Sequence, residues 1–450
     1  MSSLPKDTAA SRWLEGRVTD ASTAVSGIQS GDRVFVQGGH ATSVLLLEAL
    51  VSRASELTNV EVMHLHSLAE HPHLRPGLAG HIRHNALFAG PHSREAVQSG
   101  RADYTPVFLA DVPGLITSGR LGVDVALVQV SPPDSHGFCS LGPSVDIGKA
   151  ALETARLIVA EINPQVPRTH GCSCLHTRDI DFAVLSDHPL PVMEPAVIGP
   201  EAQEIGRLVA TLIEDGSTIQ TGIGAVPTAV LNSLHDKHDL GIHTELLPDG
   251  VVDLFEAGVI TGRHKTVDNR LIVGSFALGT QKILDFINDN AGVHLVGTDR
   301  TNDTARIRRQ EKMIAINAAI EVDLSGQVAA ESIGPMLYSG TGGQMDFMRG
   351  ASLARGGKAI IAITSTARRG TASRLTPMLA MGAAVTTPRD QVQYVVTEYG
   401  IAELSGRTLK QRGEALVAIS HPDFRAELRR WLRGTRTYAL SSEESASVGT

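Results

Sequence analysis

A strand–glycine–helix pattern occurs twice in this chain in the same register. The first copy covers residues 28–46 and the second covers residues 213–231, and Gly31 and Gly216 take the same place in the two copies, 185 residues apart. Each copy reads as a turn, a short β-rich strand, a loop containing glycine and an apolar helix. The repeat predicts an α/β fold made of two related domains, one in each half of the chain. A chance likeness between two such units is the alternative.

Apolar runs suited to strands alternate with helix-like segments in both halves. They cover residues 60–65, 125–130 and 157–162 in the first half and residues 271–276, 359–363 and 394–397 in the second. The run 359–363 is continuously apolar, which is typical of a strand buried on both faces of a parallel sheet. We therefore expect mostly parallel sheets that are covered by helices.

A proline-rich stretch, residues 186–200, separates the two halves and is predicted to be the inter-domain linker. The predicted domains accordingly cover residues 12–190 and residues 200–438. Residues 441–450 are rich in serine and glutamate, and we predict a disordered tail there.

The composition narrows the class of protein. The chain has 450 residues, too many for one ordinary core, and a formal net charge of −8, which argues against a nucleic-acid partner. No apolar run approaches the roughly 20 residues of a membrane helix, and residues 1–11 lack the apolar region of a secretory signal. Three cysteines do not make a disulfide framework. We expect a cytoplasmic protein without nucleic-acid or membrane partners.

Glu245 is the candidate catalytic residue. It stands shortly before Pro248, Asp249 and Gly250, which predict a turn. A carboxylate at such a bend is held by the fold and can face a cleft. In a partly dry cleft it can act as a nucleophile toward an activated acyl group.

Two glycine-rich segments are candidate ligand loops. The first follows a strand and opens a helix, where backbone N–H groups favour negative charge; it comprises Gly222, Ile223, Gly224, Ala225 and Val226. It lacks the third glycine of a dinucleotide fingerprint, so a packing turn is an equal alternative. The second contains Gly340, Gly342 and Gly343 and suits a loop whose amides point at a ligand or an oxyanion. A flexible connector is its alternative.

Two further segments contain polar residues near possible ligand positions. Asp134 and His136 lie in a Pro- and Gly-rich loop after a predicted strand, where they can bind substrate or satisfy local backbone groups. A second segment combines two histidines with two cysteines: His170, Cys172, Cys174 and His176. Its spacing differs from that of structural zinc sites, and we predict no metal.

Together these segments resemble the acetyl-CoA hydrolase/transferase family, the class I CoA-transferases that include 4-hydroxybutyrate and acetate CoA-transferases. The resemblance is carried, in family order, by residues 130–142, 222–227, 241–253, 339–347 and 395–402, with support from residues 319–327 and 420–425. It covers nearly the whole chain. Each segment is weak alone, and the set is specific.

The resemblance implies two CoA-transferase-like (NagB/RpiA-like) α/β domains with the active site between them. It implies that Glu245 matches the catalytic glutamate, that residues 222–226 touch CoA, and that residues 340–343 form CoA contacts and part of the oxyanion hole. It also places Lys358 among the CoA contacts, although an ordinary exposed lysine is an equal reading. A homodimer or larger homo-oligomer is implied, with acyl-CoA and a short carboxylate as substrates and no tightly bound cofactor.

The implied activity is transfer of CoA from an acyl-CoA to a small carboxylic acid. Glutamyl anhydride and glutamyl-CoA thioester intermediates would make the kinetics ping-pong. Hydrolysis of the same intermediate by water, giving an acetyl-CoA or short-chain acyl-CoA hydrolase, uses the same motifs, and a non-catalytic CoA-binding protein is a more distant alternative. The sequence departs from the family pattern at Pro248, Thr364 and Gln393, which leaves the accepted acid open.

Overall fold

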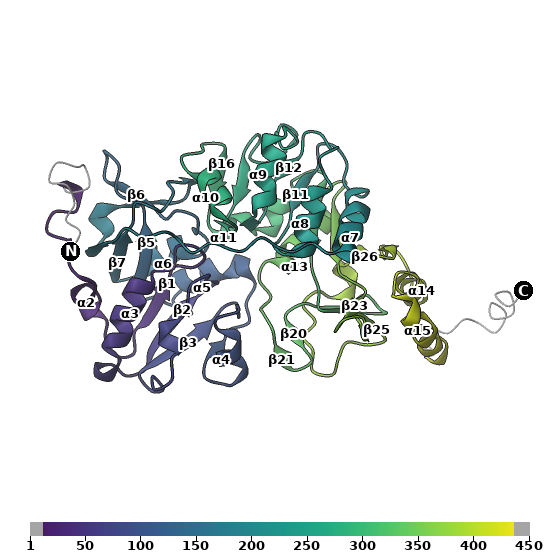
Figure 1. Ribbon diagram of the computed structural model, residues 1–450, viewed down its shortest axis with the longest axis horizontal. Helices are drawn as coiled ribbons and strands as arrows, with labels where there is room; N and C mark the ends of the chain where they lie inside the picture. Colours follow the sequence, from purple (N-terminus) through teal and green to yellow (C-terminus); the bar gives the residue numbers. More distant parts are fainter. Residues whose placement is uncertain (1–11, 436–450) are drawn as a thin grey trace, which may run out of the picture.

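The computed structural model describes residues 12–435, and these form two lobes that lie side by side (Figure 1). The predicted tail, residues 441–450, and the end of the second predicted domain lie outside the described residues. None of the helices in residues 12–435 is both long and apolar enough to cross a lipid bilayer.

A seven-stranded sheet of the order β10-β7-β5-β1-β2-β3-β4 forms the first lobe, and all its neighbouring strands are parallel. Its strands are β1 (Arg33–Val36), β2 (Val60–His64), β3 (Ile82–Ala86), β4 (Asp103–Tyr104), β5 (Val125–Val130), β7 (Leu157–Ile162) and β10 (Phe182–Leu185). The accompanying helices are α2 (Ala21–Ala24), η1 (Val25–Gly27), α3 (Val44–Ser52), η2 (Ala54–Glu56), η3 (Pro72–Leu74), α4 (Arg94–Gln98), η4 (Leu109–Asp111), α5 (Val112–Thr117), α6 (Gly148–Thr154) and η5 (Thr177–Asp179).

A six-stranded sheet of the order β12-β11-β17-β22-β26-β27 forms the second lobe, and only its last pair is antiparallel. Its strands are β11 (Thr218–Gln220), β12 (Gly241–Ile242), β17 (Met313–Asn317), β22 (Lys358–Ala362), β26 (Tyr394–Thr397) and β27 (Gly400–Glu403). The helices are α7 (Pro200–Ala210), α8 (Ala225–Asn232), α9 (Asp249–Glu256), α10 (Gln281–Ile287), α11 (Thr298–Thr301), α12 (Thr304–Ile307), α13 (Gln344–Leu353), η6 (Arg389–Gln391), α14 (Leu409–Ala418) and α15 (Pro422–Gly434). The expected α/β class with mostly parallel sheets is confirmed.

Short strands form small sheets around these two. They are β6 (Phe138–Ser140) with β9 (Cys174–His176), β13 (Leu246–Leu247) with β15 (Phe276–Ala277), β14 (Ile272–Gly274) with β16 (Val293–Leu295) and β8 (His170–Gly171), β18 (Glu321–Asp323) with β19 (Val328–Ala329) and β25 (Leu375–Thr376), β20 (Ser332–Ile333) with β21 (Met336–Leu337), and β23 (Thr366–Ala367) with β24 (Ala372–Ser373). Strand β8 comes from the first half of the chain but pairs with β16 of the second. The two halves therefore share a sheet.

Both copies of the sequence repeat form the predicted unit. In the first, β1 is followed by a loop and α3; in the second, β11 is followed by a loop and α8. The helix starts earlier in the second copy, at Ala225, because its glycine loop is shorter. Each unit stands where the strand order of its sheet reverses, the place where open α/β sheets hold ligands.

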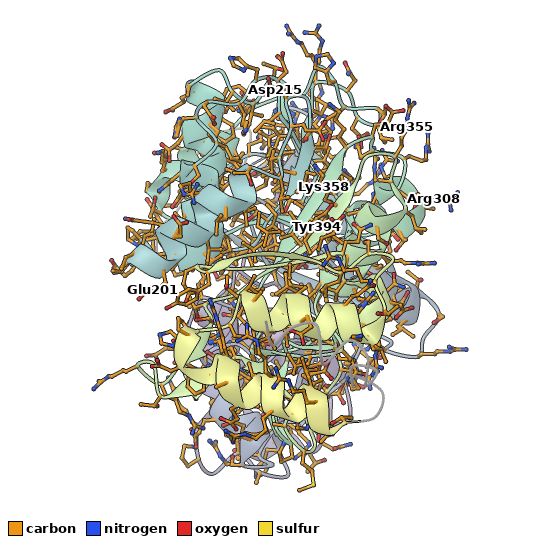
Figure 2. All side chains as sticks on the ribbon, turned by 90° about the vertical axis from the view of Figure 1, so that its right-hand side faces the viewer. Glu201, Asp215, Arg308, Arg355, Lys358 and Tyr394 are labelled. Carbon is orange, nitrogen blue, oxygen red and sulfur yellow. The ribbon has the colours of Figure 1, made fainter. Side chains whose placement is uncertain are left out.

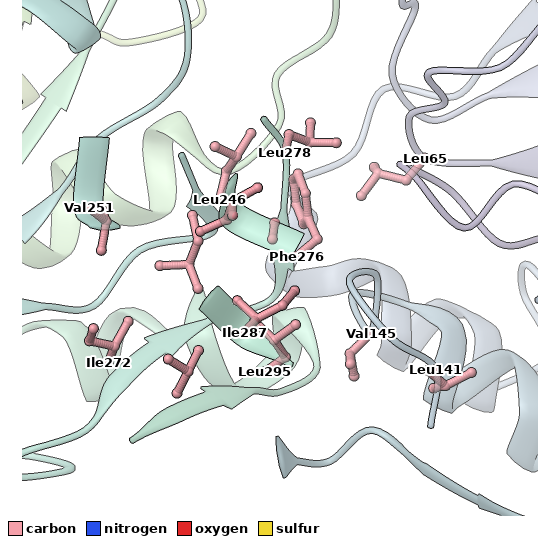
Figure 3. Packing of buried hydrophobic residues seen from close by; sticks show 14 of the residues in the cluster. Leu65, Leu141, Val145, Leu246, Val251, Ile272, Phe276, Leu278, Ile287 and Leu295 are labelled. Carbon is pink, nitrogen blue, oxygen red and sulfur yellow. The ribbon is translucent and has the colours of Figure 1, made fainter. Parts of the chain in front are cut away.

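One buried hydrophobic cluster continues from the first half of the chain into the second (Figure 3). Leu65 and Val145 of the first half belong to the same cluster as Leu246, Phe276 and Leu278 of the second. Apolar packing of this extent joins the lobes and fixes the two sheets relative to each other. The predicted boundary at residues 190–200 falls in a segment, 186–199, that contains no helix or strand; the domain limits themselves stay a prediction.

Candidate active site

Glu245 lies between β12 and β13, and its backbone is fixed on both sides. Its carbonyl oxygen accepts hydrogen bonds from the backbone N–H groups of Ser275 at 2.8 Å and Phe276 at 3.2 Å. The strand predicted over residues 271–276 is interrupted at Ser275, where the chain changes from β14 to β15. The carboxyl side chain of Glu245 therefore starts from a rigid backbone rather than from a free loop.

Thr244 connects this backbone to the first glycine loop. Its buried hydroxyl donates to the carbonyl oxygen of Thr221 at 3.0 Å and accepts from the Thr221 N–H at 3.3 Å. The predicted turn after Glu245 is instead the start of α9, with Pro248 as its N-cap residue and Asp249 in its first turn. An acidic residue suits that position because it faces the positive end of the helix dipole.

Two donors hold the carboxyl group of Glu245. The side-chain amide of Asn302 donates to Oε2 at 2.7 Å, and the backbone N–H of Gly343 is a second donor. A Cβ atom on Gly343 would lie 1.8 Å from that oxygen. The φ of Gly343 is −98°, which any residue adopts, so glycine is required here for space and not for backbone conformation.

A second carboxyl group shares the amide of Asn302. Asn302 Nδ2 lies 3.2 Å from Oδ2 of Asp346, which also accepts from the backbone N–H of Ala110 at 3.2 Å. Burial raises the pKa of Glu245 to about 7, with the charges of Asp346 and Asp146 adding to the effect and the two donors opposing it. Burial likewise raises the pKa of Asp346 to about 7. The pair forms a hydrogen-bonded acidic centre in which Asp346 is buried and Glu245 is partly buried at the cavity wall, and perturbed carboxyl groups in a cleft mark candidate catalytic sites.

Two cavities meet at Glu245. The smaller, about 170 Å³, is mainly apolar and is lined from both lobes, by Leu65 and Phe88 on one side and by Leu246 and Phe347 on the other. The larger, about 740 Å³, extends past the second glycine loop and is lined by residues that include Arg368 and Arg374. The walls include residues just after β2 and β3 and at the ends of β11 and β17, so the carboxyl ends of both sheets converge here.

The structure brings both predicted glycine loops to these cavities. Gly222 and Ile223 line the smaller one, and Gly340, Gly342 and Gly343 line the larger one. Gly224 has φ 105° and ψ −178°, a conformation that only glycine adopts readily, and no atom lies within 4 Å of the position a Cβ would take. Ala225 and Val226 begin α8 directly behind this loop.

The second loop is fastened to the first lobe. The carbonyl oxygen of Ser339 accepts from the Ala89 N–H at 2.9 Å, and that of Gly342 accepts from the Leu109 N–H at 3.1 Å. The loop beside Glu245 is therefore positioned by the opposite lobe, as expected of a site between two domains.

Lys358 is not brought to this site. It is the first residue of β22, whereas the cavities adjoin the carboxyl ends of the strands. Its Nζ donates to the carbonyl oxygen of Leu212 at 2.6 Å and lies 3.2 Å from Glu214 Oε1 (Figure 2 shows the residue within the second lobe). A lysine before a parallel strand enters at the amino edge of the sheet, opposite the ligand edge.

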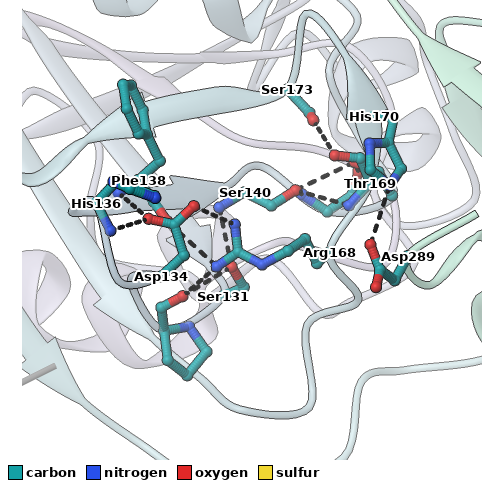
Figure 4. Close-up of polar contacts among 12 residues, drawn as sticks. Ser131, Asp134, His136, Phe138, Ser140, Arg168, Thr169, His170, Ser173 and Asp289 are labelled. Carbon is teal, nitrogen blue, oxygen red and sulfur yellow. Dashed lines mark hydrogen bonds and ion pairs between the residues drawn. The ribbon is translucent and has the colours of Figure 1, made fainter. Parts of the chain in front are cut away.

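The loop of Asp134 is held by local hydrogen bonds (Figure 4). Oδ1 of Asp134 accepts from the N–H groups of His136 at 2.9 Å and Phe138 at 3.0 Å, and Arg168 lies 3.6 Å from the other oxygen. The alternative of local backbone satisfaction, left open by the sequence, accounts for Asp134.

The His/Cys segment is spread over different surroundings. His170 contacts Asp289 at 3.1 Å, and His176 packs edge-on against Trp13 and Phe138. Cys172 is partly buried, and Cys174 is exposed. The two histidines thus have different neighbours.

Several residues of the site carry no signal in the sequence. Asn302 and Asp346 lie 57 and 101 positions from Glu245, and neither belongs to a motif that marks them as its partners. Asp346 lies near the end of the second glycine segment, residues 339–347. Only the fold shows that it lies beside Glu245. The sequence likewise does not indicate that Leu65, His66 and Phe88 of the first lobe line the smaller cavity.

Comparison with known proteins identifies the family of this chain. Residues 1–194 match the acetyl-CoA hydrolase/transferase N-terminal domain, and residues 279–432 match the C-terminal domain of the same name. The chain is similar to the 4-hydroxybutyrate coenzyme A transferase of Clostridium kluyveri, with 48% identity over 92% of this chain and 96% of that protein.

Solved structures give the same result. The crystal structure of RipA from Yersinia pestis has a TM-score of 0.90 at 33% identity, covering 95% of this chain and 99% of that one. The 4-hydroxybutyrate CoA-transferase of Porphyromonas gingivalis has a TM-score of 0.82 at 36% identity, covering 94% and 99%. Matching domain models, close relatives and a common fold over nearly the full length together show that the chain belongs to the acetyl-CoA hydrolase/transferase family.

Proposed function

We propose that this protein is a CoA-transferase that moves CoA from an acyl-CoA to a short carboxylic acid through Glu245. The observation that carries the proposal is the place of the Glu245 carboxyl group. It lies where a small apolar cavity meets a larger one, and it is held by Asn302 and the Gly343 N–H. The relative named as 4-hydroxybutyrate coenzyme A transferase supports this class of reaction.

The reaction begins when the ionised Glu245 attacks the thioester carbonyl of acyl-CoA. The C–S bond breaks, CoA leaves as the thiolate, and an acyl-glutamyl anhydride remains. The thiolate then attacks the glutamyl carbonyl, which forms a glutamyl-CoA thioester and releases the first acid as its carboxylate. The second acid repeats these steps in reverse and leaves as its CoA thioester, so Glu245 is regenerated.

The partial burial of Glu245 serves this chemistry. Burial destabilises the carboxylate, which makes its attack on a carbonyl more favourable than in water. The amides of the 340–343 loop are suited to receive the oxyanion of each tetrahedral intermediate, and loss of one such donor commonly costs about 3–4 kcal/mol. A thiolate is a good leaving group, so the proposed reaction needs no tightly bound cofactor.

The two cavities suggest how the substrate is divided. The smaller, apolar cavity fits a short acyl group. The larger one leads past the 340–343 loop to Arg368 and Arg374, whose guanidinium groups suit the phosphates of the CoA nucleotide. Gly222 and Gly224 leave open space for a ligand to approach the backbone beside Glu245. Binding energy from the remote nucleotide can then be used at the reacting carbonyl.

Consumption of acetyl-CoA with and without added acid tests the proposal. Acetate, propionate, succinate and 4-hydroxybutyrate are supplied in turn, with a labelled acid in the case of acetate, and the new acyl-CoA is measured. We expect consumption that depends on the acid, abolished in Glu245→Ala and retained in the control Glu256→Ala, whose side chain is exposed on α9. Consumption without any acid indicates a hydrolase, and binding of CoA without turnover indicates a non-catalytic protein. The cytoplasmic location and the homodimeric or larger assembly stay predictions from the sequence.

A further inference from the structure

Four histidines meet inside the first lobe, away from Glu245. His64 ends β2, His84 lies within β3, and His71 and His73 come from the connection between these strands, where His73 belongs to η3. Each side chain is at most 8% exposed. Histidine is not a usual core residue, so a group of four in one buried place needs a physical reason.

The ring nitrogens of this four-histidine cluster are largely without hydrogen-bond partners. Within the described residues, both nitrogens of His64, both of His71, Nδ1 of His73 and Nε2 of His84 have none. Each buried polar atom left in this way destabilises the fold, because it gives up its hydrogen bonds to water and gains none in the protein. Packing of the rings alone would leave these costs uncompensated, whereas buried polar groups in native proteins nearly always have a partner, such as a water or an ion.

The geometry matches a single ion. Each of the four rings offers one nitrogen such that all four nitrogens lie within 4.8 Å of one another. Zinc–nitrogen bonds of about 2.0–2.1 Å place neighbouring ligand atoms of a tetrahedron about 3.3 Å apart. Nε2 of His73 and Nδ1 of His84 already lie 3.1 Å apart, and His64 and His71 each supply a nitrogen without a partner, so the set is compact enough to converge on one ion.

We propose that His64, His71, His73 and His84 form a binding site for one divalent transition-metal ion of the kind that prefers imidazole, with Zn²⁺ as the first candidate. Imidazole nitrogen suits zinc, copper, iron and nickel, whereas magnesium and calcium prefer oxygen ligands. Four protein ligands close the coordination sphere of zinc, which is the arrangement of structural rather than catalytic zinc sites. The site differs from the His/Cys segment considered in the sequence, and it departs from the expectation that the chain holds no metal.

The position of the cluster indicates what the ion does. Residues 65–81 connect β2 to β3 and contain only the short helix η3, so little regular structure holds them. An ion on His71 and His73 from this connection and on His64 and His84 from the strands fastens the connection to the sheet. Leu65 and His66, which directly follow His64, line the cavity beside Glu245. The metal therefore supports one wall of the active site without touching substrate.

The cluster is within reach of solvent ions. His73 and His84 line a surface pocket of about 310 Å³, whose other walls come mainly from residues 74–83. His92 lies outside the cluster; its ring is 5.8 Å from that of His71, and its side chain is exposed. His92 therefore provides a matched control, because it is a neighbouring histidine that does not contribute to the proposed site.

The direct test is the metal content of full-length protein purified without a histidine tag. We expect close to one zinc, or one other imidazole-preferring metal, per chain in the wild type and in His92→Gln. His73→Gln and His84→Gln should each lose the metal. Protein stripped with a chelator and titrated with Co²⁺ should give the visible absorption of tetrahedral cobalt, saturating at one equivalent. Metal-free wild-type protein that takes up no Zn²⁺ or Co²⁺ would overturn the proposal, as would variants that bind as much metal as the wild type.

A second readout applies if the histidine variants do not fold. The melting temperature of the wild type is measured with and without a zinc chelator and after Zn²⁺ is returned. A bound structural ion stabilises the folded state by mass action, so the chelator should lower the melting temperature and Zn²⁺ should restore it. An unchanged melting temperature under all three conditions contradicts the proposal. Both readouts are independent of catalysis, so they stand or fall separately from the CoA-transfer proposal.

Discussion

Replacing Glu245 with Gln should stabilise the fold above pH 7 while it abolishes CoA transfer. The pKa of this carboxyl group rises from 4.5 to about 7 on folding, mainly because burial disfavours its charge. Between these values the folded protein holds a proton that the unfolded chain releases. The stability tied to that proton is present below pH 4.5 and is lost as the pH rises through about 7. Each pH unit of the interval is worth about 1.4 kcal/mol, so the carboxylate lowers the free energy of unfolding by up to about 3 kcal/mol above pH 7.

The neutral glutamine keeps the shape of the side chain, and its oxygen can accept from Asn302 and the Gly343 N–H. The melting temperatures of wild type and Glu245→Gln are therefore compared by calorimetry from pH 5 to pH 8.5. The advantage of the variant should be small at pH 5 and should grow until about pH 8. Glu256→Gln, an exposed carboxylate on α9, controls for the loss of one charge. A difference in melting temperature that does not depend on pH would refute the argument that ionising Glu245 destabilises the fold. A variant less stable than the wild type at pH 8 would refute it as well.

Three further predictions concern the surroundings of Glu245. Gly343→Ala should lower kcat by at least about 100-fold, because its Cβ displaces the carboxyl group by the order of 1 Å; Gly114→Ala, where no atom lies within 4 Å of the new Cβ, is the control and should leave kcat unchanged. Asp346→Asn should move the acidic limb of the pH profile of kcat/KM to lower pH, since it removes a negative charge that raises the pKa of Glu245; an unmoved limb argues against the coupling. Lys358→Met should leave KM for acyl-CoA unchanged, because Lys358 donates to the Leu212 carbonyl oxygen at the amino edge of the sheet; a large rise in KM would indicate that Lys358 does contact CoA.

Much of the fold follows from local patterns. The glycine loops at 222 and 38 interrupt strongly apolar segments, so strand and helix are separated by residues that suit neither. Continuous apolar runs such as 359–363 correctly indicate strands covered on both faces, and this one forms most of β22. The pairing of β8 with β16 could not be read in this way, because hydrogen bonds between distant short strands leave no periodic pattern.

The candidate site likewise combines residues that the sequence indicates with residues that only the fold brings together. Glu245 and the glycine loops could be proposed as candidates from the sequence because their neighbours there carry chemical meaning. Asn302 and Asp346 reach Glu245 only because α11 and α13 pack beside it. The local sequence does not indicate that packing. Lys358 is the opposite case: the resemblance placed it among the CoA contacts, whereas the fold puts it at the amino end of β22, away from the cavities. The four-histidine cluster has no local sequence signature, because its members come from two strands and from the irregular connection between them, and only the fold brings them together.

The most direct test of the account is chemical trapping of the Glu245 intermediate. Protein is incubated with acyl-CoA without an acceptor acid, treated with borohydride, digested with a protease that cleaves before aspartate, which separates Glu245 from Glu256 at Asp249 and Asp253, and examined by mass spectrometry with the Glu256 peptide as internal control. We predict that the peptide containing Glu245 alone carries the mass change of a carboxyl group reduced to an alcohol, and that omitting acyl-CoA abolishes it. An unmodified Glu245 peptide in protein that is turning over acyl-CoA, or reduction at another carboxylate, would contradict the account.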